Sequence, residues 1–243
     1  MLINCDMGES FGAWTMGQDA LIMPYIDMAN IACGMHASDP SVMQKTVQLA
    51  NKHNVKIGAH PSYPDLQGFG RRHIAMSPDE LESYVIYQLG ALQGLCISEK
   101  AQISYVKPHG ALYNDMMRDD DIFTTLLKSV QKYNPALPLM IMAVPDKQRY
   151  IEMAKKYGIT LLFEAFIDRT YQRDGRLTPR SHAFSVFETV DEIIAQANNL
   201  ISHRKVITPE GESILVEADT LCIHGDGKLA LDVAKALRQR FEL

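Results

Sequence analysis

Seven short apolar segments recur along the chain, and longer segments with helical spacing separate them. The apolar segments are residues 2–6, 28–34, 55–60, 103–109, 138–144, 160–166 and 220–226. Most of these segments lack alternation of polar and apolar side chains, which is typical of parallel strands that are buried on both faces. The pattern therefore predicts seven buried parallel strands.

Start signals for helices lie between the predicted strands. Residues 77–80 and 189–192 both match a capping box, in which a Ser or Thr stands three positions before a Glu. Further helix starts are expected at residues 39–40, at residues 145–146 with an end near Gly158, and just after residues 225–227. Strands and helices therefore alternate along the whole chain.

The alternation predicts a single α/β domain over residues 1–243, folded as a closed or nearly closed (β/α) barrel of about seven parallel strands. An open, doubly wound sheet is the structural alternative. Two segments interrupt the repeat. Residues 166–188 form a long insertion, and residues 205–218 have the pattern of a hairpin that turns at Glu210-Gly211.

Composition and charge narrow the classes of function. The 243 residues are 47% hydrophobic and 22% charged, and the net charge of -5 argues against a nucleic-acid-binding protein. No apolar run reaches the roughly 18 residues of a membrane span, and the first ten residues lack the features of a signal peptide. We therefore expect a cytoplasmic protein, without a membrane segment, whose four cysteines are buried, reduced thiols.

Ionisable residues gather where the predicted strands end. They are Asp6, Glu9, His36, His60, Arg71, Arg72, Lys107, His109, Glu164, Asp168, Arg169, His224 and Asp226. In a parallel barrel the carboxyl ends of the strands meet at one rim, where active sites are built. Each residue alone has a simpler explanation, such as a helix cap for Asp6 or Asp226. Together they predict a pocket at the rim, whereas His53, His73, His182 and His203 follow no strand and are interpreted as surface or structural residues.

Two kinds of chemistry suit this set of side chains. Asp6, His36, His60, His109 and His224 provide imidazoles and a carboxylate for metal-assisted hydrolysis, although no HExxH motif occurs and a bound divalent ion stays an open question. Arg71, Arg72, Lys107 and Arg169 provide cations for phosphate chemistry, and the helix start near residues 224–228 offers backbone amides to an anion. No P-loop motif is present.

Long motifs then connect the chain to a known family. Residues 4–12, 30–40, 57–72, 106–114, 164–180 and 223–227 resemble the LamB/YcsF family from end to end. The resemblance implies a distorted β/α barrel related to polysaccharide deacetylases. It also implies an ATP-dependent 5-oxoprolinase activity, which converts 5-oxo-L-proline to L-glutamate with ATP hydrolysis, in a complex with partner subunits B and C.

The resemblance also implies roles for the rim residues. Candidate catalytic residues are Asp6, Glu9, His60, Lys107, His109, Glu164 and Asp226, and candidate substrate- or phosphate-binding residues are His36, Arg71, Arg72, Arg169 and His224. ATP with Mg²⁺ is the expected cofactor. Two other functions stay open: a stand-alone metal-dependent deacetylase or amidohydrolase acting on a carbohydrate or small amide, and a non-catalytic subunit that presents substrate to a partner.

Overall fold

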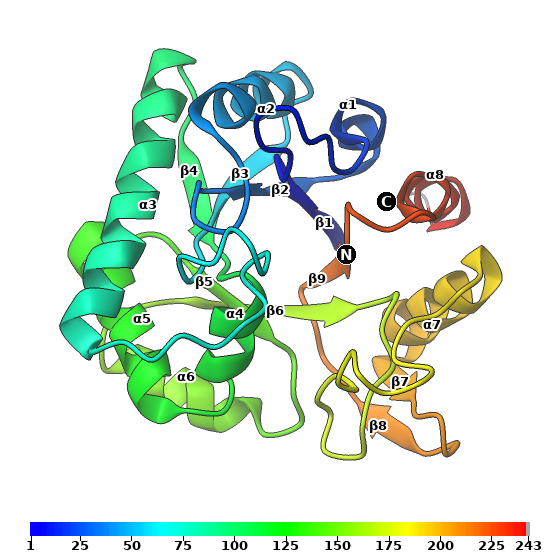
Figure 1. Cartoon of the computed structure of the whole chain (residues 1–243). Helices are drawn as coiled ribbons and strands as arrows, with labels where there is room; N and C mark the ends of the chain where they lie inside the picture. The colour runs from blue at the N-terminus through cyan, green and yellow to red at the C-terminus, as the bar shows by residue number, and fades with distance from the viewer. Residues whose placement is uncertain (242–243) are drawn as a thin grey trace.

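Seven parallel strands close into a barrel, and they follow one another around the ring in chain order (Figure 1). The strands are β1 Leu2–Met7, β2 Met28–Ala32, β3 Lys56–His60, β4 Ile103–Val106, β5 Leu139–Met142, β6 Leu161–Phe166 and β9 Thr220–Ile223. Strand β9 pairs in parallel with both β6 and β1 and so closes the ring. This computed structural model describes residues 1–241. The predicted barrel is confirmed, and the alternative of an open sheet is wrong.

Helices connect successive strands and cover the outside of the barrel (Figure 1). They are α1 Asp19–Ile22, the 3-10 helix η1 Met23–Tyr25, α2 Pro40–Lys52, α3 Pro78–Ser98, α4 Gly110–Met116, α5 Asp120–Tyr133, α6 Lys147–Lys155, α7 Val190–His203 and α8 Ala230–Phe241. Both predicted capping boxes are formed, at the starts of α3 and α7. Within residues 1–241, no helix combines the length and the apolar character needed to cross a membrane.

Two predicted helices are found, with bounds that differ from the predicted ones by two or three residues. Helix α6 covers only Lys147–Lys155, which is shorter than the predicted segment from Pro145 to Gly158. Helix α8 begins at Ala230 and not directly after Gly227, because residues 225–229 form turns and a bend. The backbone amides near residues 224–228 therefore belong to the turn that precedes α8, and their role as an anion site stays a prediction.

The two faces of the barrel strands differ in polarity. In β1, Ile3, Cys5 and Met7 belong to the large apolar core between the barrel and the helices. The alternate residues Asn4 and Asp6 instead bond to polar groups of other strands, across the inside of the barrel. Because successive strand residues point to opposite faces, the strand places polar side chains inside the barrel and apolar side chains against the helices.

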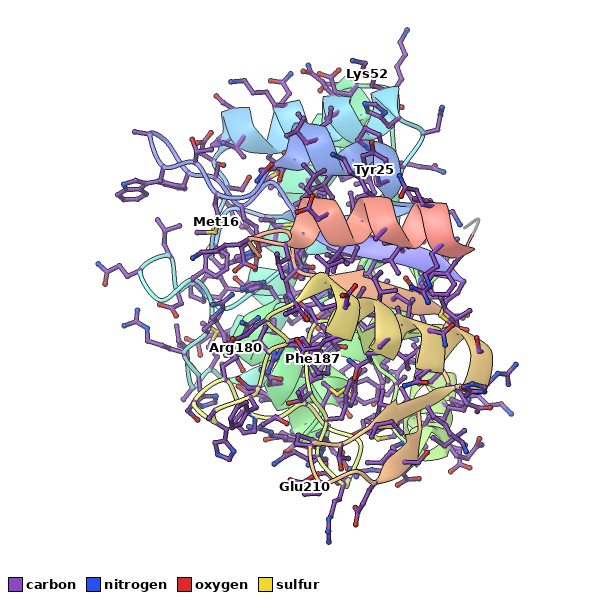
Figure 2. The ribbon with its side chains drawn as sticks, turned by 90° about the vertical axis from the view of Figure 1, so that its right-hand side faces the viewer. Met16, Tyr25, Lys52, Arg180, Phe187 and Glu210 are labelled. Carbon is purple, nitrogen blue, oxygen red and sulfur yellow. The ribbon has the colours of Figure 1, made fainter. Side chains whose placement is uncertain are left out.

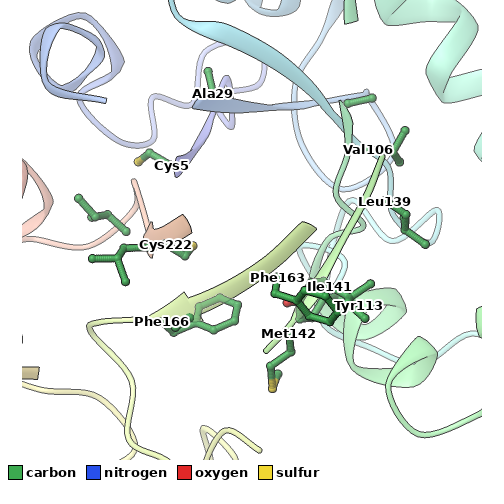
Figure 3. Packing of buried hydrophobic residues seen from close by; sticks show 14 of the residues in the cluster. Cys5, Ala29, Val106, Tyr113, Leu139, Ile141, Met142, Phe163, Phe166 and Cys222 are labelled. Carbon is green, nitrogen blue, oxygen red and sulfur yellow. The ribbon is translucent and has the colours of Figure 1, made fainter. Parts of the chain in front are cut away.

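The apolar packing explains why the strands were recognisable in the sequence. Figure 3 shows Ala29, Val106 and Leu139 directed away from the barrel axis, toward the surrounding helices. A separate small cluster of Met28, Tyr105 and Met140 fills the inside of the barrel below the polar residues. All four cysteines are buried and free, as predicted.

The insertion between β6 and α7 is anchored from within. The guanidinium group of Arg169 donates to the carbonyl oxygens of Ser185 and Thr178, at 3.0 and 2.6 Å. The side-chain amide of Gln196, on α7, donates to the carbonyl oxygens of Phe166 and Arg169 at 2.8 and 2.7 Å. These buried bonds hold the insertion in place beside the carboxyl end of β6.

The predicted hairpin is confirmed and lies outside the barrel (Figure 1). Its strands, β7 Lys205–Ile207 and β8 Ser213–Leu215, are antiparallel, and Gly211 lies in the turn with a φ of 86°. Such a φ is readily adopted only by glycine. The hairpin thus extends the α7 side of the molecule without changing the parallel order of the barrel.

Gly58 provides a test of the packing inside the barrel. A Cβ atom at Gly58 would overlap with the ring of Tyr105 from the neighbouring strand. We predict that Gly58→Ala lowers the free energy of unfolding by about 1–3 kcal/mol, because both side chains lie in a closed barrel and have little room to move. Urea unfolding followed by circular dichroism measures this change.

Gly90→Ala is the matched control. Gly90 is exposed on α3 and an added Cβ would meet no atom within 4 Å. Alanine favours a helix over glycine by about 0.5–1 kcal/mol, so this variant should be more stable than the parent chain. Equal stability of the two variants would contradict the proposed overlap in the barrel.

Candidate active site

Lys107 lies at the centre of the polar interior, just beyond the end of β4. Its ammonium group is 2.9 Å from Asp6 Oδ1 and 3.1 Å from Glu164 Oε2, and all three side chains are buried. Asn4 Oδ1 and Cys222 Sγ lie 3.3 and 3.2 Å from the same nitrogen. Strands β1, β6 and β9 therefore each direct a side chain at one lysine.

A chain of neutral hydrogen bonds orients the carboxylate of Asp6. The side-chain amide of Asn30 donates to Asp6 Oδ1 and to Asn4 Oδ1, both at 2.8 Å. The hydroxyl of Tyr105 donates to Asn30 Oδ1 at 2.6 Å, and the amide of Asn4 donates to Thr220 Oγ1 at 3.1 Å. Each amide is thereby fixed in one orientation, and Asp6 has little freedom to move.

The charges in this cluster depend on one another. Burial alone would raise the pKa of Asp6, but Lys107 and then His60 hold it well below its usual range. Burial alone would lower the pKa of Lys107, but Asp6 and Glu164 raise it well above its usual range. Asp6 and Lys107 are therefore both charged at neutral pH, and the ammonium group faces two carboxyl groups.

Glu164 and Tyr113 stand out in this network. Both carboxyl oxygens of Glu164 and the hydroxyl of Tyr113 are buried without a hydrogen bond to any group in residues 1–241. The ammonium group of Lys107, at 3.1 Å, is the charge that faces Glu164. Burial first, and then the neighbouring Glu164, raise the pKa of Tyr113 well above its usual value. Tyr113 therefore stays neutral and can donate a hydrogen bond to a bound oxygen.

A second cluster combines three histidines with a carboxyl group. His60 Nε2 and His109 Nδ1 are 3.0 Å apart, and Glu9 Oε1 lies 3.2 Å from His36 Nε2 and 3.6 Å from His109 Nδ1. These side chains are buried, and their inner atoms lie within 4.8 Å of one another, as in a metal site. Burial, with contributions from neighbouring histidines, lowers the pKa values of His36 and His109, and burial beside Asp6 raises the pKa of Glu9.

The loop after β3 packs directly on these imidazoles. Gly70 has a φ of 64°, and a Cβ atom at this position would lie 2.8 Å from His109 Cδ2 and from His36 Cβ. The carbonyl oxygen of Phe69 accepts a hydrogen bond from His109 Nε2 at 2.9 Å. The GFGR segment therefore holds the ring of His109 in place, and Gly70 permits the close approach.

A cavity of about 310 Å³ opens at this end of the barrel. Side chains at its wall include Asp6, His60, Arg71, Lys107, His109, Tyr113, Arg118, Phe166, Arg169, Arg180 and His224. Figure 2 shows Met16, from the loop after β1, and Arg180, from the insertion, on the same side of the molecule. The loops after β3, β4, β6 and β9 contribute residues to the cavity wall, and Asp6 and Lys107 of the buried network also line it.

The structure brings most of the predicted site residues together. Asp6, Glu9, His36, His60, Lys107, His109 and Glu164 form the two buried clusters. At the mouth of the cavity, Arg71 pairs with Asp226 at 3.0 Å, and His224 Nδ1 lies 2.7 Å from Asp168 Oδ2. At the entrance, Asp226 thus orients the guanidinium group of Arg71, and Asp168 orients the imidazole of His224.

Two of the predicted phosphate-binding arginines already form bonds with other groups of the protein. Arg72 forms an ion pair with Asp65 and is not part of the cavity wall. Arg169 reaches the wall, but its guanidinium group is committed to the carbonyl oxygens of the insertion. Burial and the neighbouring Arg180 lower the pKa of Arg169 to about 10.

Several residues of the site were missed by the sequence interpretation. Arg118 and Arg180 line the cavity, are exposed, and form no ion pair within residues 1–241, so they are free to bind an anion. Asn4 and Asn30 were missed in the interior. For Asn4 the signal was the second polar residue Asp6 two positions along the same buried strand, whereas Asn30 is the single polar residue of its strand and carried no such signal.

The other predictions about histidine agree with the structure. His73 is exposed and lies 2.7 Å from Asp115, outside the cavity wall. His53 ends helix α2, and His182 and His203 are exposed. A second group that could hold a metal ion consists of Asp6, Cys222 and His224, but the ammonium group of Lys107 already lies beside two of these.

The fold and the cavity together define the class of protein. It is a parallel (β/α) barrel with a cavity lined by ionisable side chains at the carboxyl ends of its strands. The sequence profile of the LamB/YcsF family matches residues 1–243, and the chain belongs to this family. It is 53% identical to the 5-oxoprolinase A subunit of Vibrio campbellii over 239 residues, which cover 98% of this chain and 94% of that protein.

Two further relatives extend the comparison. The 5-oxoprolinase A subunit of Chromohalobacter salexigens is 49% identical over 241 residues, covering 99% of this chain and 96% of the relative. The crystal structure of the lactam utilization protein from Thermus thermophilus superposes with a TM-score of 0.92 at 40% identity, covering 100% of this chain and 96% of that one. The family implied by the sequence motifs is therefore confirmed.

Replacing Lys107 tests the charge network. We predict that Lys107→Met lowers the free energy of unfolding by about 3–5 kcal/mol at pH 7.5, because it leaves two carboxyl groups buried without their cation. The lowered pKa of Asp6 means that the parent chain loses stability as the pH falls through that lowered value.

In the Lys107→Met variant the stability depends on pH in the opposite direction. Without the ammonium group, burial raises the pKa of Asp6 above its value in the unfolded chain, about 3.9, so the variant loses stability as the pH rises. The deficit measured by urea unfolding should shrink between pH 7.5 and pH 4.5. Lys132→Met, which removes an exposed pair with Glu82, should cost less than about 1 kcal/mol at both pH values. A Lys107→Met deficit independent of pH would contradict the network.

Proposed function

We propose that this chain is the A subunit of an ATP-dependent 5-oxoprolinase, which hydrolyses 5-oxo-L-proline to L-glutamate. The observation that carries the proposal is the 53% identity, over 98% of the chain, to a protein described as the A subunit of 5-oxoprolinase. The similarity in fold to a lactam utilization protein agrees with a cyclic amide as substrate. We expect the enzyme to act in the cytoplasm together with partner subunits B and C.

The chemistry of a lactam explains the need for ATP. A five-membered cyclic amide is a poor electrophile, and transfer of the γ-phosphoryl group of ATP to its carbonyl oxygen, with release of ADP, would activate the ring carbon. Water could then add to that carbon, the C–N bond would break as the ring nitrogen takes up a proton, and a second water would hydrolyse the remaining acyl phosphate to glutamate and phosphate. Negative charge then develops on phosphoryl and carbonyl oxygens, and fixed cations stabilise such charge. Lys107 on the floor and Arg71, Arg118 and Arg180 at the wall of the cavity are suitable cations.

The size of the cavity bears on where ATP binds. A volume of about 310 Å³ is at the lower end of the range for small-molecule sites. It suits 5-oxoproline together with a phosphoryl group, and a whole nucleotide would extend beyond it. We therefore propose that MgATP enters as a substrate complex, with its phosphate groups near the mouth arginines and the rest of the nucleotide outside the cavity or against a partner subunit.

Asp6 and Lys107 are the residues on which we expect turnover to depend most. Both line the cavity, and both are fixed by neighbours in the closed barrel. Asp6 is ionised because Lys107 and His60 outweigh the effect of burial on its pKa. Its carboxylate can therefore accept a proton from water or from the ring nitrogen of the lactam. His60, which borders the same cavity, lies 3.5 Å from Asp6 Oδ1 and helps to orient that carboxylate.

Reconstitution tests the proposal. The purified chain alone should convert little 5-oxoproline, and addition of subunits B and C should give glutamate and ADP in equal amounts. In the complex, Asp6→Asn should lower kcat by at least about 100-fold, the usual effect of losing a positioned acid or base. Lys132→Ala, which changes an exposed residue on α5, is the control and should leave the rate unchanged.

The other outcomes distinguish the remaining functions. Full activity of the complex with Asp6→Asn would identify a non-catalytic presenting subunit. Amide hydrolysis by the chain alone, without ATP and abolished by a chelator, would identify a metal-dependent amidohydrolase. Absence of ATP-coupled turnover with both partners present would exclude the proposed function.

Arg180 tests the binding of anionic groups at the mouth. We predict that Arg180→Ala raises KM for ATP or for 5-oxoproline about tenfold, which corresponds to about 1.4 kcal/mol. Its stability should not change, because the side chain is exposed and has no ion pair within residues 1–241. Arg173→Ala, in the same insertion but outside the cavity wall, is the matched control. Unchanged KM values for both substrates would remove Arg180 from the site.

A further inference from the structure

Hydrogen bonds to the backbone determine which nitrogens of His60 and His109 carry protons. His60 Nδ1 lies 2.7 Å from the carbonyl oxygen of Lys107, and His109 Nε2 lies 2.9 Å from the carbonyl oxygen of Phe69. A carbonyl oxygen only accepts hydrogen bonds, so each of these nitrogens is an N–H donor. In the neutral imidazoles the remaining nitrogens, His60 Nε2 and His109 Nδ1, are therefore both lone-pair acceptors.

These two acceptors face each other. His60 Nε2 and His109 Nδ1 are 3.0 Å apart, and no donor lies between them. Two lone pairs at this distance repel unless a cation bridges them, either a shared proton or a metal ion. The carboxylate oxygens nearest to the pair, Asp6 Oδ1 at 3.5 Å from His60 and Glu9 Oε1 at 3.6 Å from His109, add negative charge at the same place.

Glu9 has the position of a third ligand. Its Oε1 atom also lies 3.2 Å from His36 Nε2, and His36 Nδ1 is 3.0 Å from the hydroxyl of Ser62. The rings of His36 and His109 are stacked at 3.7 Å between centroids and are nearly parallel, so their lone pairs do not point at one common position. The hydroxyl of Ser62 donates to the carbonyl oxygen of Tyr63 at 2.8 Å and therefore accepts from His36 Nδ1, so Nε2 of the neutral His36 ring is the acceptor that faces Glu9. A proton shared between His36 Nε2 and Glu9 Oε1 holds this pair together, and His36 thereby orients Glu9.

The spacing agrees with metal coordination. Ligand atoms at about 2.0–2.1 Å from a tetrahedral Zn²⁺ ion lie roughly 3.4 Å apart. Two of the three ligand-to-ligand distances, 3.0 Å between the two imidazole nitrogens and 3.6 Å from His109 Nδ1 to Glu9 Oε1, bracket this value, and the whole set lies within 4.8 Å. Backbone carbonyls that accept from the outer N–H groups, and a histidine behind the carboxylate, are the usual supports of metal ligands.

We propose that His60 Nε2, His109 Nδ1 and the carboxylate of Glu9 bind one divalent transition-metal ion, with His36 as the positioning residue for Glu9. Two imidazoles and one carboxylate are a ligand set for Zn²⁺, Co²⁺, Mn²⁺ or Fe²⁺ and suit Mg²⁺ and Ca²⁺ poorly. Because His60 and His109 line the cavity, the open position of the metal would face the substrate. The metal site does not depend on the proposed 5-oxoprolinase activity.

Cobalt binding to the isolated chain tests this site without an activity assay. The full chain is stripped with a chelator, titrated with CoCl₂, and followed by visible absorption and by metal analysis after gel filtration. We expect one equivalent of Co²⁺ and a visible spectrum typical of nitrogen and oxygen ligands. Glu9→Gln, His60→Ala and His109→Ala should each weaken binding by more than about 100-fold, and His36→Ala by about 10- to 100-fold.

Two controls separate this site from others. His73→Ala removes an exposed histidine outside the cavity and should leave binding unchanged. A thiolate charge-transfer band, or loss of binding in His224→Ala but not in His109→Ala, would place the metal at Asp6, Cys222 and His224 and overturn the proposal. If the chain does not bind one equivalent of Co²⁺, a shared proton bridges the two histidines, and the proposal is likewise overturned.

A measurement on the parent chain covers the case in which a variant does not fold. In the Co²⁺-loaded protein, proton NMR should show two exchangeable, paramagnetically shifted imidazole N–H signals, from His60 Nδ1 and His109 Nε2. Both protons are held by backbone carbonyls and should exchange slowly with solvent. If these signals are missing while cobalt is bound, the ligands are not these two histidines.

Discussion

The buried contact of Lys107 with Asp6 and Glu164 is the constraint on which the rest of the site depends. An ammonium group inside a barrel is stable only if carboxylates and hydrogen bonds replace its water, and here they come from strands β1 and β6. Such an arrangement requires strands from distant parts of the sequence to be adjacent or opposite. The charge network therefore links the polar interior to the closure of the barrel itself.

The fold was largely predictable because its signals are local or topological. Buried parallel strands appear as apolar runs, and capping boxes such as Ser77 to Glu80 mark helix starts. Helix bounds were less predictable: α8 begins at Ala230 because residues 225–229 turn first, and no local signal separates these residues from the helix. The polar interior was also missed, since isolated residues such as Asn4 and Asn30 do not disrupt an apolar run.

The site was partly predictable for a different reason. The rule that parallel strands end at one rim places Asp6, His60, Lys107 and His109 together without any knowledge of their contacts. The rule does not determine side-chain direction within a loop. Arg72 therefore turned out to pair with Asp65, whereas Arg118 and Arg180, which follow no strand end directly, reach the cavity through the tertiary fold.

The side chains around the cavity are of two kinds: the two buried clusters are fixed, and the arginines at the mouth are adaptable. Lys107, Asp6 and the histidines are buried and held by strand ends or by the loop at Gly70, so their geometry changes little when a ligand binds. The arginines at the mouth have exposed side chains and can adjust their conformation to a bound anion. Preorganised charge lowers a barrier only if it needs no rearrangement during the reaction. The cavity therefore presents a ligand with a rigid floor of charged groups beneath a rim of exposed, adaptable cations.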